Sequence, residues 1–356
     1  MQLENIGFNA WFQERLDSGK SRELQPARVI AINKNSYQVS DGSGPVTAEL
    51  TGRLMFNADS PLELPAVGDW VYVQIADDRS LAVIHDIFPR KTLLKRKTVG
   101  KRVEWQLIAA NIDSAMIIQA LDADFNLRRL ERYLVMVNES NITPVILLSK
   151  SDLLHTTEIE AKKTEIRSLM PDIGIIAFSN IDASQVDSVR RVLIPGCTYC
   201  LLGSSGVGKT TLINRLVDGE LYETRAVREK DGKGRHTTSR RQLISLDNGA
   251  LIIDTPGMRE LGNIAVDSGL EKTFGEIAEL TEQCRFNDCS HINEEGCAVL
   301  AAVENGTLER ERYLSYLKLR RESEYYEASY REKREKDRKF GKYCKSVMKD
   351  KKKERG

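Results

Sequence analysis

Short alternating runs of hydrophobic and polar residues dominate the first quarter of the chain. Between residues 27 and 88, the alternation has the period at which successive side chains of a strand point to opposite faces. Turn-forming pairs such as Asp41-Gly42 and Gly44-Pro45 separate the runs. The predicted strands are 28–32, 37–40, 47–51, 69–75 and 81–87. Five short strands in about 60 residues suit a β-barrel of the oligonucleotide-binding (OB) type, or a small barrel of another kind.

The pattern changes between residues 111 and 263, where continuous apolar runs alternate with helical periodicity. Runs that are apolar on both sides are typical of strands covered on both faces. These strands are predicted at 115–120, 144–148, 173–177, 198–202 and 250–253. Apolar residues between them recur every three to four positions, which predicts helices at 127–137, 158–169 and 210–216. The alternation predicts an α/β domain, a parallel sheet with helices on both faces.

Beyond residue 266 the pattern is helical around a cysteine cluster, which completes a multidomain organisation. The predicted parts are an N-terminal extension (1–26), the barrel (27–95), the α/β domain (96–265), a helical module (266–320) and a charged tail (321–356). The 356 residues, 41% of them hydrophobic, are ordinary for a globular protein of two or three domains. No apolar run reaches the roughly 18 residues of a membrane span, and no secretory signal pattern opens the chain, so we expect a cytoplasmic protein.

The net charge of +1 hides a segregation of charge along the chain. Residues 318–356 contain 16 Lys and Arg against 8 Asp and Glu, so the remainder is acidic. Residues 90–102 contain seven Lys and Arg and no acid. That basic segment is either a solvated connector or a phosphate-binding one, and its position beside a possible OB barrel favours phosphate binding. Divided in this way, the charge supports a nucleic-acid partner.

Four residues within 14 positions have the chemistry of a structural zinc site. The spacing Cys284-x4-Cys289-x-His291-x5-Cys297 supplies three thiols and an imidazole, the donor set of a closed tetrahedral site. Unrelated buried thiols are the alternative, but the clustering of four donors favours one structural Zn²⁺. Cys197 and Cys200 lie on an apolar run and are interpreted as small core residues.

A glycine-rich loop follows the predicted strand at 198–202. The sequence GSSGVGKT, which begins at Gly203, matches G-x4-G-K-[ST] with a strand before it and a helical run after it. Glycines let backbone N–H groups turn inward around a β-phosphate, Lys209 reaches the β- and γ-oxygens, and Thr210 can ligate Mg²⁺. The predicted nucleotide-binding residues of this loop are Gly203, Ser204, Ser205, Gly206, Val207, Gly208, Lys209, Thr210 and Thr211.

A second phosphate element, Asp254-Thr-Pro-Gly257, directly follows the predicted strand at 250–253. An Asp at the end of a buried strand can hold Mg²⁺ through water, and the Gly257 N–H can sense a γ-phosphate. The same four residues can form an ordinary turn, but their position downstream of a phosphate loop favours the metal role.

The polar segment 224–241 lies between the two phosphate elements and is typical of a switch loop. Thr237 or Thr238 is expected to complete the Mg²⁺ shell when a γ-phosphate is present. Met258 stands where many GTPases place a glutamine that orients water, a function that methionine cannot perform. His236 is therefore the candidate that aligns the attacking water, and an exposed loop histidine is the alternative. The catalytic candidates are His236, Lys209, Thr237 and Thr238.

The segment LLSKSD at 147–152 resembles the guanine-specificity box N-K-x-D of GTPases. In that box the Asp accepts hydrogen bonds from guanine N1 and the exocyclic amine, and the Lys stem packs on the base. Lys150 and Asp152 are present, whereas Ser149 replaces Asn and loses an amide able to pair with guanine and tie to the phosphate loop. We expect weaker nucleotide affinity and retained selectivity. Ser179 and Asn180 lie where GTPases place a second base contact, S-A-x, from which Asn180 departs.

The order of these boxes is reversed relative to ordinary GTPases, because the base box precedes the phosphate loop. This order indicates a circular permutation. With the barrel, the cysteine cluster and the segments VGDWV (67–71) and QLIAANID (106–113), the chain closely resembles the RsgA or YjeQ family of small-ribosomal-subunit-dependent biogenesis GTPases over about residues 27–320. The resemblance implies an OB-type barrel, binding of the small subunit and its rRNA, and hydrolysis of GTP to GDP with Mg²⁺ during late subunit maturation. It also implies a hydrolytic role for His236.

Two other classes of function compete with a ribosome-stimulated GTPase. Ser149 and Met258 are compatible with a nucleotide-binding RNA scaffold of negligible hydrolysis, or with a divergent paralogue acting on another RNA. A P-loop ATPase acting on nucleic acid is disfavoured by Asp152. We expect a monomer with no membrane partner.

Overall fold

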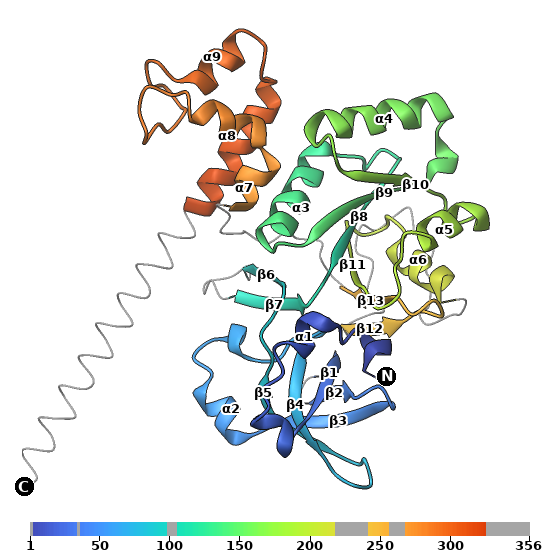
Figure 1. The fold of residues 1–356 in the computed structure, drawn as a ribbon. Helices are drawn as coiled ribbons and strands as arrows, with labels where there is room; N and C mark the ends of the chain where they lie inside the picture. The colour runs from blue at the N-terminus through green and yellow to red at the C-terminus, as the bar shows by residue number, and fades with distance from the viewer. Residues whose placement is uncertain (1–2, 34–35, 98–104, 218–240, 256–267, 325–356) are drawn as a thin grey trace, which may run out of the picture. The chain divides into compact units, whose positions relative to one another are not determined.

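The residues that the structure describes divide into two compact units, the first within residues 1–96 and 105–261 and the second within residues 97–104 and 262–356 (Figure 1). The computed structural model describes residues 3–33, 36–97, 105–217, 241–255 and 268–324. The first unit combines the predicted barrel with the predicted α/β domain, and the second contains the cysteine cluster.

The barrel is closed and five-stranded, which confirms the predicted small β-barrel. Its strands are β1 (Gln25–Ile32), β2 (Tyr37–Ser40), β3 (Pro45–Leu50), β4 (Trp70–Ile75) and β5 (Ala82–Ile87). They pair in the order β1-β2-β3-β5-β4, and β4 pairs back onto β1 to close the barrel. Small and β-branched side chains such as Ala27, Val29, Val39 and Val73 fill the interior, as a narrow barrel requires. Between β3 and β4 lie α2 (Gly52–Asn57) and the 3₁₀-helix η3 (Pro61–Glu63).

The N-terminal extension packs on the outside of this barrel. It contains η1 (Glu4–Ile6), α1 (Ala10–Gln13) and η2 (Lys20–Arg22). Phe8 lies edge-on to Trp70 at 4.7 Å between ring centroids, and Phe12 belongs to the same buried cluster. These aromatic contacts bury apolar surface and thereby hold the extension on the barrel.

Five parallel strands form the central sheet of the α/β domain. They are β8 (Ser114–Ala120), β9 (Thr143–Ser149), β10 (Gly174–Ala177), β11 (Thr198–Leu202) and β13 (Leu251–Asp254), in the order β10-β9-β8-β11-β13. The predicted strands are all present. One further strand, β12 (Gln242–Ser245), was not predicted; it runs antiparallel to β13 and adds an antiparallel strand at this edge of the parallel sheet. With four residues and only two apolar ones, β12 gives little periodicity to detect.

Helices cover both faces of the sheet, as predicted. They are α3 (Leu127–Glu139), α4 (Thr156–Leu169), α5 (Ala183–Arg190) and α6 (Lys209–Leu216). Met116 and Ile118 on β8 pack in one buried cluster with residues of α5 and α6. Ala115 and Ile117 alternate to the opposite face, and α3 contacts β8 and β9. The sheet is therefore buried on both sides, which explains the continuous apolar runs.

A buried arginine joins the barrel to the α/β domain. Strand β1 pairs with β12 at Ala31 and Gln242, so the two sheets are continuous. Beside this seam the Arg28 guanidinium donates to Ile6 O at 2.6 Å, Gly68 O at 3.2 Å and Thr198 Oγ1 at 2.8 Å. Burial lowers the pKa of Arg28 to about 10, against the opposing charges of two nearby aspartates. Four segments of the unit thus meet at one side chain.

The described part of the basic segment after the barrel forms a strand, and two of its cations are ion-paired. Leu93–Lys97 forms β6, which pairs with β7 (Trp105–Ala110). Arg90 is ion-paired with the buried Asp69 at 2.8 Å, and Lys91 with Asp113 at 2.7 Å. These two cations are neutralised inside the unit and are poor candidates for phosphate contacts.

The second unit is helical in its described part, as the sequence predicts. Its helices are α7 (Ser268–Thr273), α8 (Gly275–Thr281), α9 (Ala298–Glu304) and a helix over residues 310–324. Arg312 is buried over the Phe274 ring and donates to Glu276 Oε1 at 2.6 Å, which ties the last helix to α8. None of the helices in the described ranges combines the length and apolar character needed to cross a bilayer.

Candidate nucleotide site and metal centre

The phosphate loop follows β11 and opens α6, in the strand–loop–helix context that the motif requires. Gly203 has φ 151°, and a Cβ there would lie 2.5 Å from the carbonyl oxygen of Ile118 on the neighbouring strand. Only glycine permits this close approach. Lys209 Nζ donates to the carbonyls of Gly203 at 2.7 Å and Ser204 at 2.6 Å. The ammonium is therefore held against the loop whose backbone would surround a phosphate.

The guanine box lies at the adjacent end of β9. Lys150 adopts the left-handed conformation, with φ 58°, and leads into η4 (Ser151–Leu153). Its Nζ contacts Asp122 Oδ2 at 2.7 Å, and Ser179 Oγ donates a short hydrogen bond to Asp152 Oδ1. This bond orients the Asp152 carboxylate, whose two oxygens can each still accept from one of the two adjacent N–H groups of a guanine base.

Ser149 retains a tie to the phosphate loop, and this corrects one expectation from the sequence. The hydroxyl is fully buried and donates to Val207 O at 2.7 Å, a contact across 58 residues of sequence. The expected loss of a loop tie is therefore wrong, because β9 and the loop approach closely enough for a serine to reach. The loss of an amide that can pair with guanine stands, since serine has none.

Asn180 also contacts the phosphate loop. Its Nδ2 donates to Gly208 O at 3.3 Å, and a Cβ on Gly208 would lie 2.5 Å from that nitrogen. Its Oδ1 is buried and has no hydrogen-bond partner among the described residues. A buried, unpaired carbonyl oxygen costs free energy unless something satisfies it.

Two aspartates in the β8–α3 loop, which were not among the predicted site residues, also belong to this site. Asp122 holds Lys150, and Asp124 Oδ2 accepts from Ser204 Oγ at 2.9 Å. Arg129 pairs with the same Asp124 carboxylate at 2.8 Å. Both acids follow the end of a predicted buried strand, and the carboxyl ends of parallel strands meet at one edge, so this position was a usable sign.

The magnesium and hydrolytic half of the site is only partly described. Asp254 is buried at the end of β13, beside β11, and Thr255 Oγ1 donates to Leu201 O at 2.5 Å. Three predicted roles fall outside the described residues. They are the alignment of water by His236, completion of the metal shell by Thr237 or Thr238, and sensing of the γ-phosphate by Gly257; Met258 also lies outside. The described part brings the base box, the phosphate loop and Asp254 to one edge of the sheet.

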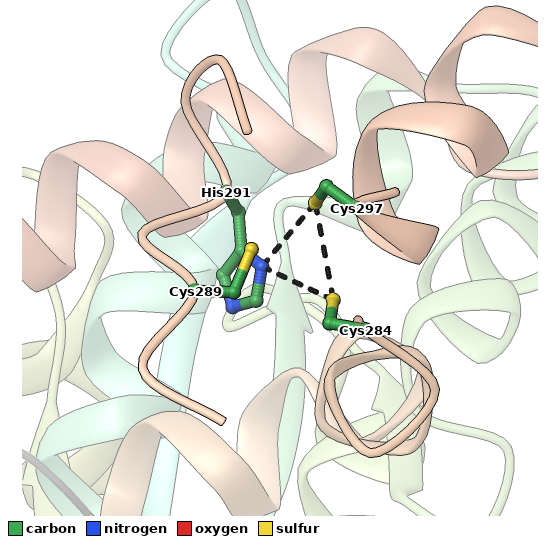
Figure 2. A group of neighbouring side chains, drawn as sticks. All are labelled: Cys284, Cys289, His291 and Cys297. Carbon is green, nitrogen blue, oxygen red and sulfur yellow. Dashed lines mark hydrogen bonds between the residues drawn. The ribbon is translucent and has the colours of Figure 1, made fainter. Parts of the chain in front are cut away.

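The second unit brings the four predicted metal ligands together (Figure 2). The donor atoms of Cys284, Cys289, His291 and Cys297 all lie within 4.8 Å of one another. His291 Nδ1 is 3.5 Å from Cys297 Sγ and 3.7 Å from Cys284 Sγ, and the two sulfurs are 3.9 Å apart. Two ligands 2.3 Å from a tetrahedral centre are about 3.8 Å apart, so the cluster fits one zinc ion.

Groups around the cluster affect the orientation and the protonation of these four residues. Thr281 Oγ1 contacts His291 Nε2 at 3.3 Å, which leaves Nδ1 facing the thiols. Burial lowers the pKa of His291, and a neutral imidazole is the form that binds metal. Burial opposes ionisation of Cys284, but the backbone N–H groups of Ala298 and Val299 lower the pKa of this thiol below its usual value. Burial raises the pKa of Cys297 to about 11, so a bound cation is needed to hold it as a thiolate.

Fold and site together define a P-loop nucleotide-binding protein of the guanine type, with its base box ahead of its phosphate loop. Residues 87–264 match the family model described as RsgA GTPase. A protein of Opitutus terrae named small ribosomal subunit biogenesis GTPase RsgA is 40% identical over 91% of this chain and 90% of its own length. One of Vibrio parahaemolyticus named small ribosomal subunit biogenesis GTPase RsgA 2 is 38% identical over 99% and 94%. The chain belongs to the RsgA GTPase family, a family of GTP-hydrolysing enzymes.

Solved structures support the fold. YjeQ from Thermotoga maritima superposes with a TM-score of 0.61 over 84% of this chain and 98% of that one, at 24% identity. YloQ, described as a circularly permuted GTPase, gives a TM-score of 0.60 over 85% and 95%, at 23% identity. The permuted order of the boxes is thus shared with known folds.

Proposed function

We propose that this protein binds the small ribosomal subunit through its rRNA and hydrolyses GTP to GDP and phosphate during late maturation of that subunit. One observation carries the proposal: a guanine box and a phosphate loop meet at one sheet edge, in a chain whose relatives are named small ribosomal subunit biogenesis GTPases. The closed barrel is of a kind that binds nucleic acid, and the excess of Lys and Arg in the tail sequence suits a polyanionic partner.

In this proposal the nucleotide is held by three groups of residues. Asp152 reads the guanine edge with Ser179 beside it, and Lys150 covers the base. The phosphate loop from Gly203 to Thr211 cradles the phosphates, and Lys209 neutralises the β- and γ-oxygens. Mg²⁺ would be held by Thr210 and, through water, by Asp254, where it would neutralise phosphate charge.

Hydrolysis requires a residue that orients water, and His236 remains the candidate. Met258 lacks a polar group for this role. Thr237 or Thr238 would bind the magnesium ion only in the GTP state, which couples the segment 224–241 to the γ-phosphate. Hydrolysis would then release the protein from the subunit.

The test compares nucleotide states and subunits directly. GTP and ATP turnover is measured with and without small subunits, and co-sedimentation with small subunits is measured with GDP and with a non-hydrolysable GTP analogue. We expect GTP-selective turnover that the subunits stimulate, and tighter co-sedimentation in the GTP-like state. Equal affinity in both states would refute the switch, and stimulation that survives His236→Ala would remove that residue from catalysis.

A nucleotide-binding RNA scaffold is the second candidate, because Met258 cannot orient water. It predicts subunit binding with negligible turnover under every condition. Cytoplasmic location and a monomeric state are part of the proposal and are tested by fractionation and by light scattering.

A further inference from the structure

Two departures from the usual guanine boxes meet at one place, the second half of the phosphate loop. Ser149 stands where the base box usually has Asn, and Asn180 stands where the second base contact usually has Ala. Ser149 Oγ donates to Val207 O at 2.7 Å and Asn180 Nδ2 donates to Gly208 O at 3.3 Å. Ser149 at the end of β9 and Asn180 in the loop after β10 therefore donate to consecutive carbonyls of the same phosphate loop.

We propose that Ser149 and Asn180 are paired positioning residues that together replace the single box asparagine of other GTPases. Ser149, at the end of β9, makes the short buried hydrogen bond to the loop. Asn180, in the loop after β10, places a carboxamide in the site where the usual box asparagine would have one. This inference deepens the proposed function, because it concerns how the same nucleotide site is held.

The local geometry explains why the pair is fitted to this loop. Gly208 has φ 93°, and any side chain there would strike Asn180 Nδ2 at 2.5 Å. Ser149 is fully buried, so its hydroxyl has little access to water; Val207 O at 2.7 Å is its nearer acceptor and Gln119 O at 3.4 Å the more distant one. Val207 is itself buried and begins the turn into α6, so both ties act immediately before Lys209.

The arrangement assigns recognition of the base and orientation of the phosphate loop to different residues, whereas the asparagine of the usual box contributes to both. Asp152 is bonded to Ser179 and reads the base, while Ser149 and Asn180 orient the phosphate-binding backbone. Asn180 Oδ1, buried and unpaired in the described structure, leaves that carboxamide an acceptor for a bound nucleotide or its water. Loss of either tie should weaken binding of the diphosphate without changing the preference for guanine.

The experiment measures dissociation constants of the full-length protein for GDP, GTP and IDP, whose base lacks the exocyclic amine. We expect Ser149→Ala and Asn180→Ala each to weaken GDP and GTP binding by about five- to tenfold, with an unchanged GDP-to-IDP ratio. The exchange Ser149→Asn with Asn180→Ala should restore GDP affinity to within about threefold of the wild type, because one carboxamide again serves the loop.

Ser151→Ala is the matched control, because Ser151 lies in the same box but donates to Gln185 Oε1 at 2.7 Å, away from the loop. It should change no dissociation constant, and thermal melting of every variant shows that it is folded. Unchanged GDP affinity in Asn180→Ala, failure of the exchange, or a GDP-to-IDP ratio that falls with the affinity would each overturn the inference. A wild-type protein that binds no guanine nucleotide would instead overturn the proposed function.

Discussion

The metal cluster and the nucleotide site are assembled in opposite ways. Four ligands between Cys284 and Cys297 form the first within one short segment. The nucleotide site is built from residues at the ends of β8, β9, β10, β11 and β13. A single hydrogen bond in it, from Ser149 to Val207, joins residues 58 positions apart in the sequence. A local site depends on its own ligands, whereas a long-range site depends on the sheet that brings its loops together.

Because of this difference, the stability of each unit depends to a different extent on its ligand. The sheet of the first unit is buried on both faces and closes against the barrel, so the loops of the nucleotide site rest on an extensive core. The described part of the second unit has a small core, and its cysteine loop contains little regular structure. We therefore expect a bound metal to supply much of the stability of the second unit and a nucleotide to supply little of that of the first.

Removal of zinc gives the largest expected effect. Structural zinc contributes on the order of 10 kcal/mol in small zinc modules, so strong chelation or Cys289→Ala should unfold residues 268–324. Limited proteolysis and zinc stoichiometry measure this outcome, while GDP binding by the first unit should persist. Cys197→Ala, outside the cluster, is the control and should retain one zinc. If the second unit resisted protease without metal, its stability would not depend on zinc, and the contrast with the nucleotide site would be wrong.

The next effect concerns the framework of the nucleotide site. Arg28→Ala removes the donor of Ile6 O, Gly68 O and Thr198 Oγ1 at the start of β11, and should lower the free energy of unfolding by about 3 kcal/mol. Urea denaturation of the first unit measures it. In the matched control, Arg79→Ala breaks an exposed ion pair with Asp41 and should cost less than about 1 kcal/mol. Equal losses in both variants would contradict a buried framework.

The same difference decides how much could be predicted from the sequence. The cysteine spacing predicted the whole cluster, because neighbours in sequence are neighbours in space there. Strong periodicity predicted the barrel and the parallel strands, but β12 was too short to detect. The Ser149 tie and the contact of Asn180 with Gly208 depend on how closely separate loops approach, and no spacing encodes that distance.

A smaller effect is expected from a residue that supports the metal loop without binding the metal. Glu294 accepts from the backbone N–H groups of Ser290, Ile292 and Asn293, and the hydrogen bond from the Ser290 hydroxyl is the main reason that its pKa falls to about 2. Glu294→Gln should weaken zinc binding by about tenfold in competition with a chelator. The exposed neighbour variant Glu295→Gln should leave it unchanged. An unaltered affinity in Glu294→Gln would show that the ligands alone hold the loop.

The smallest effect is expected at the exposed rim of the nucleotide site, where the Asp124 carboxylate lies beside the phosphate loop. Asp124→Asn keeps an acceptor for Ser204 Oγ, but it removes a negative charge beside the phosphate loop and releases Arg129 from its ion pair. Lower repulsion of an anionic ligand should therefore raise GDP affinity, by no more than about threefold, because the carboxylate is half exposed and screened by solvent.

Salt dependence distinguishes an effect of charge from a structural role of the Asp124 carboxylate. The gain in GDP affinity should be largest at low ionic strength and should disappear at high salt, as expected for a screened charge. Asp124→Ala, which also removes the acceptor for Ser204, is the comparison variant and isolates the hydrogen bond. A tenfold loss in Asp124→Asn at both ionic strengths would mean that the carboxylate orders the phosphate loop, and that the rim of the long-range site is as sensitive to single residues as the metal cluster.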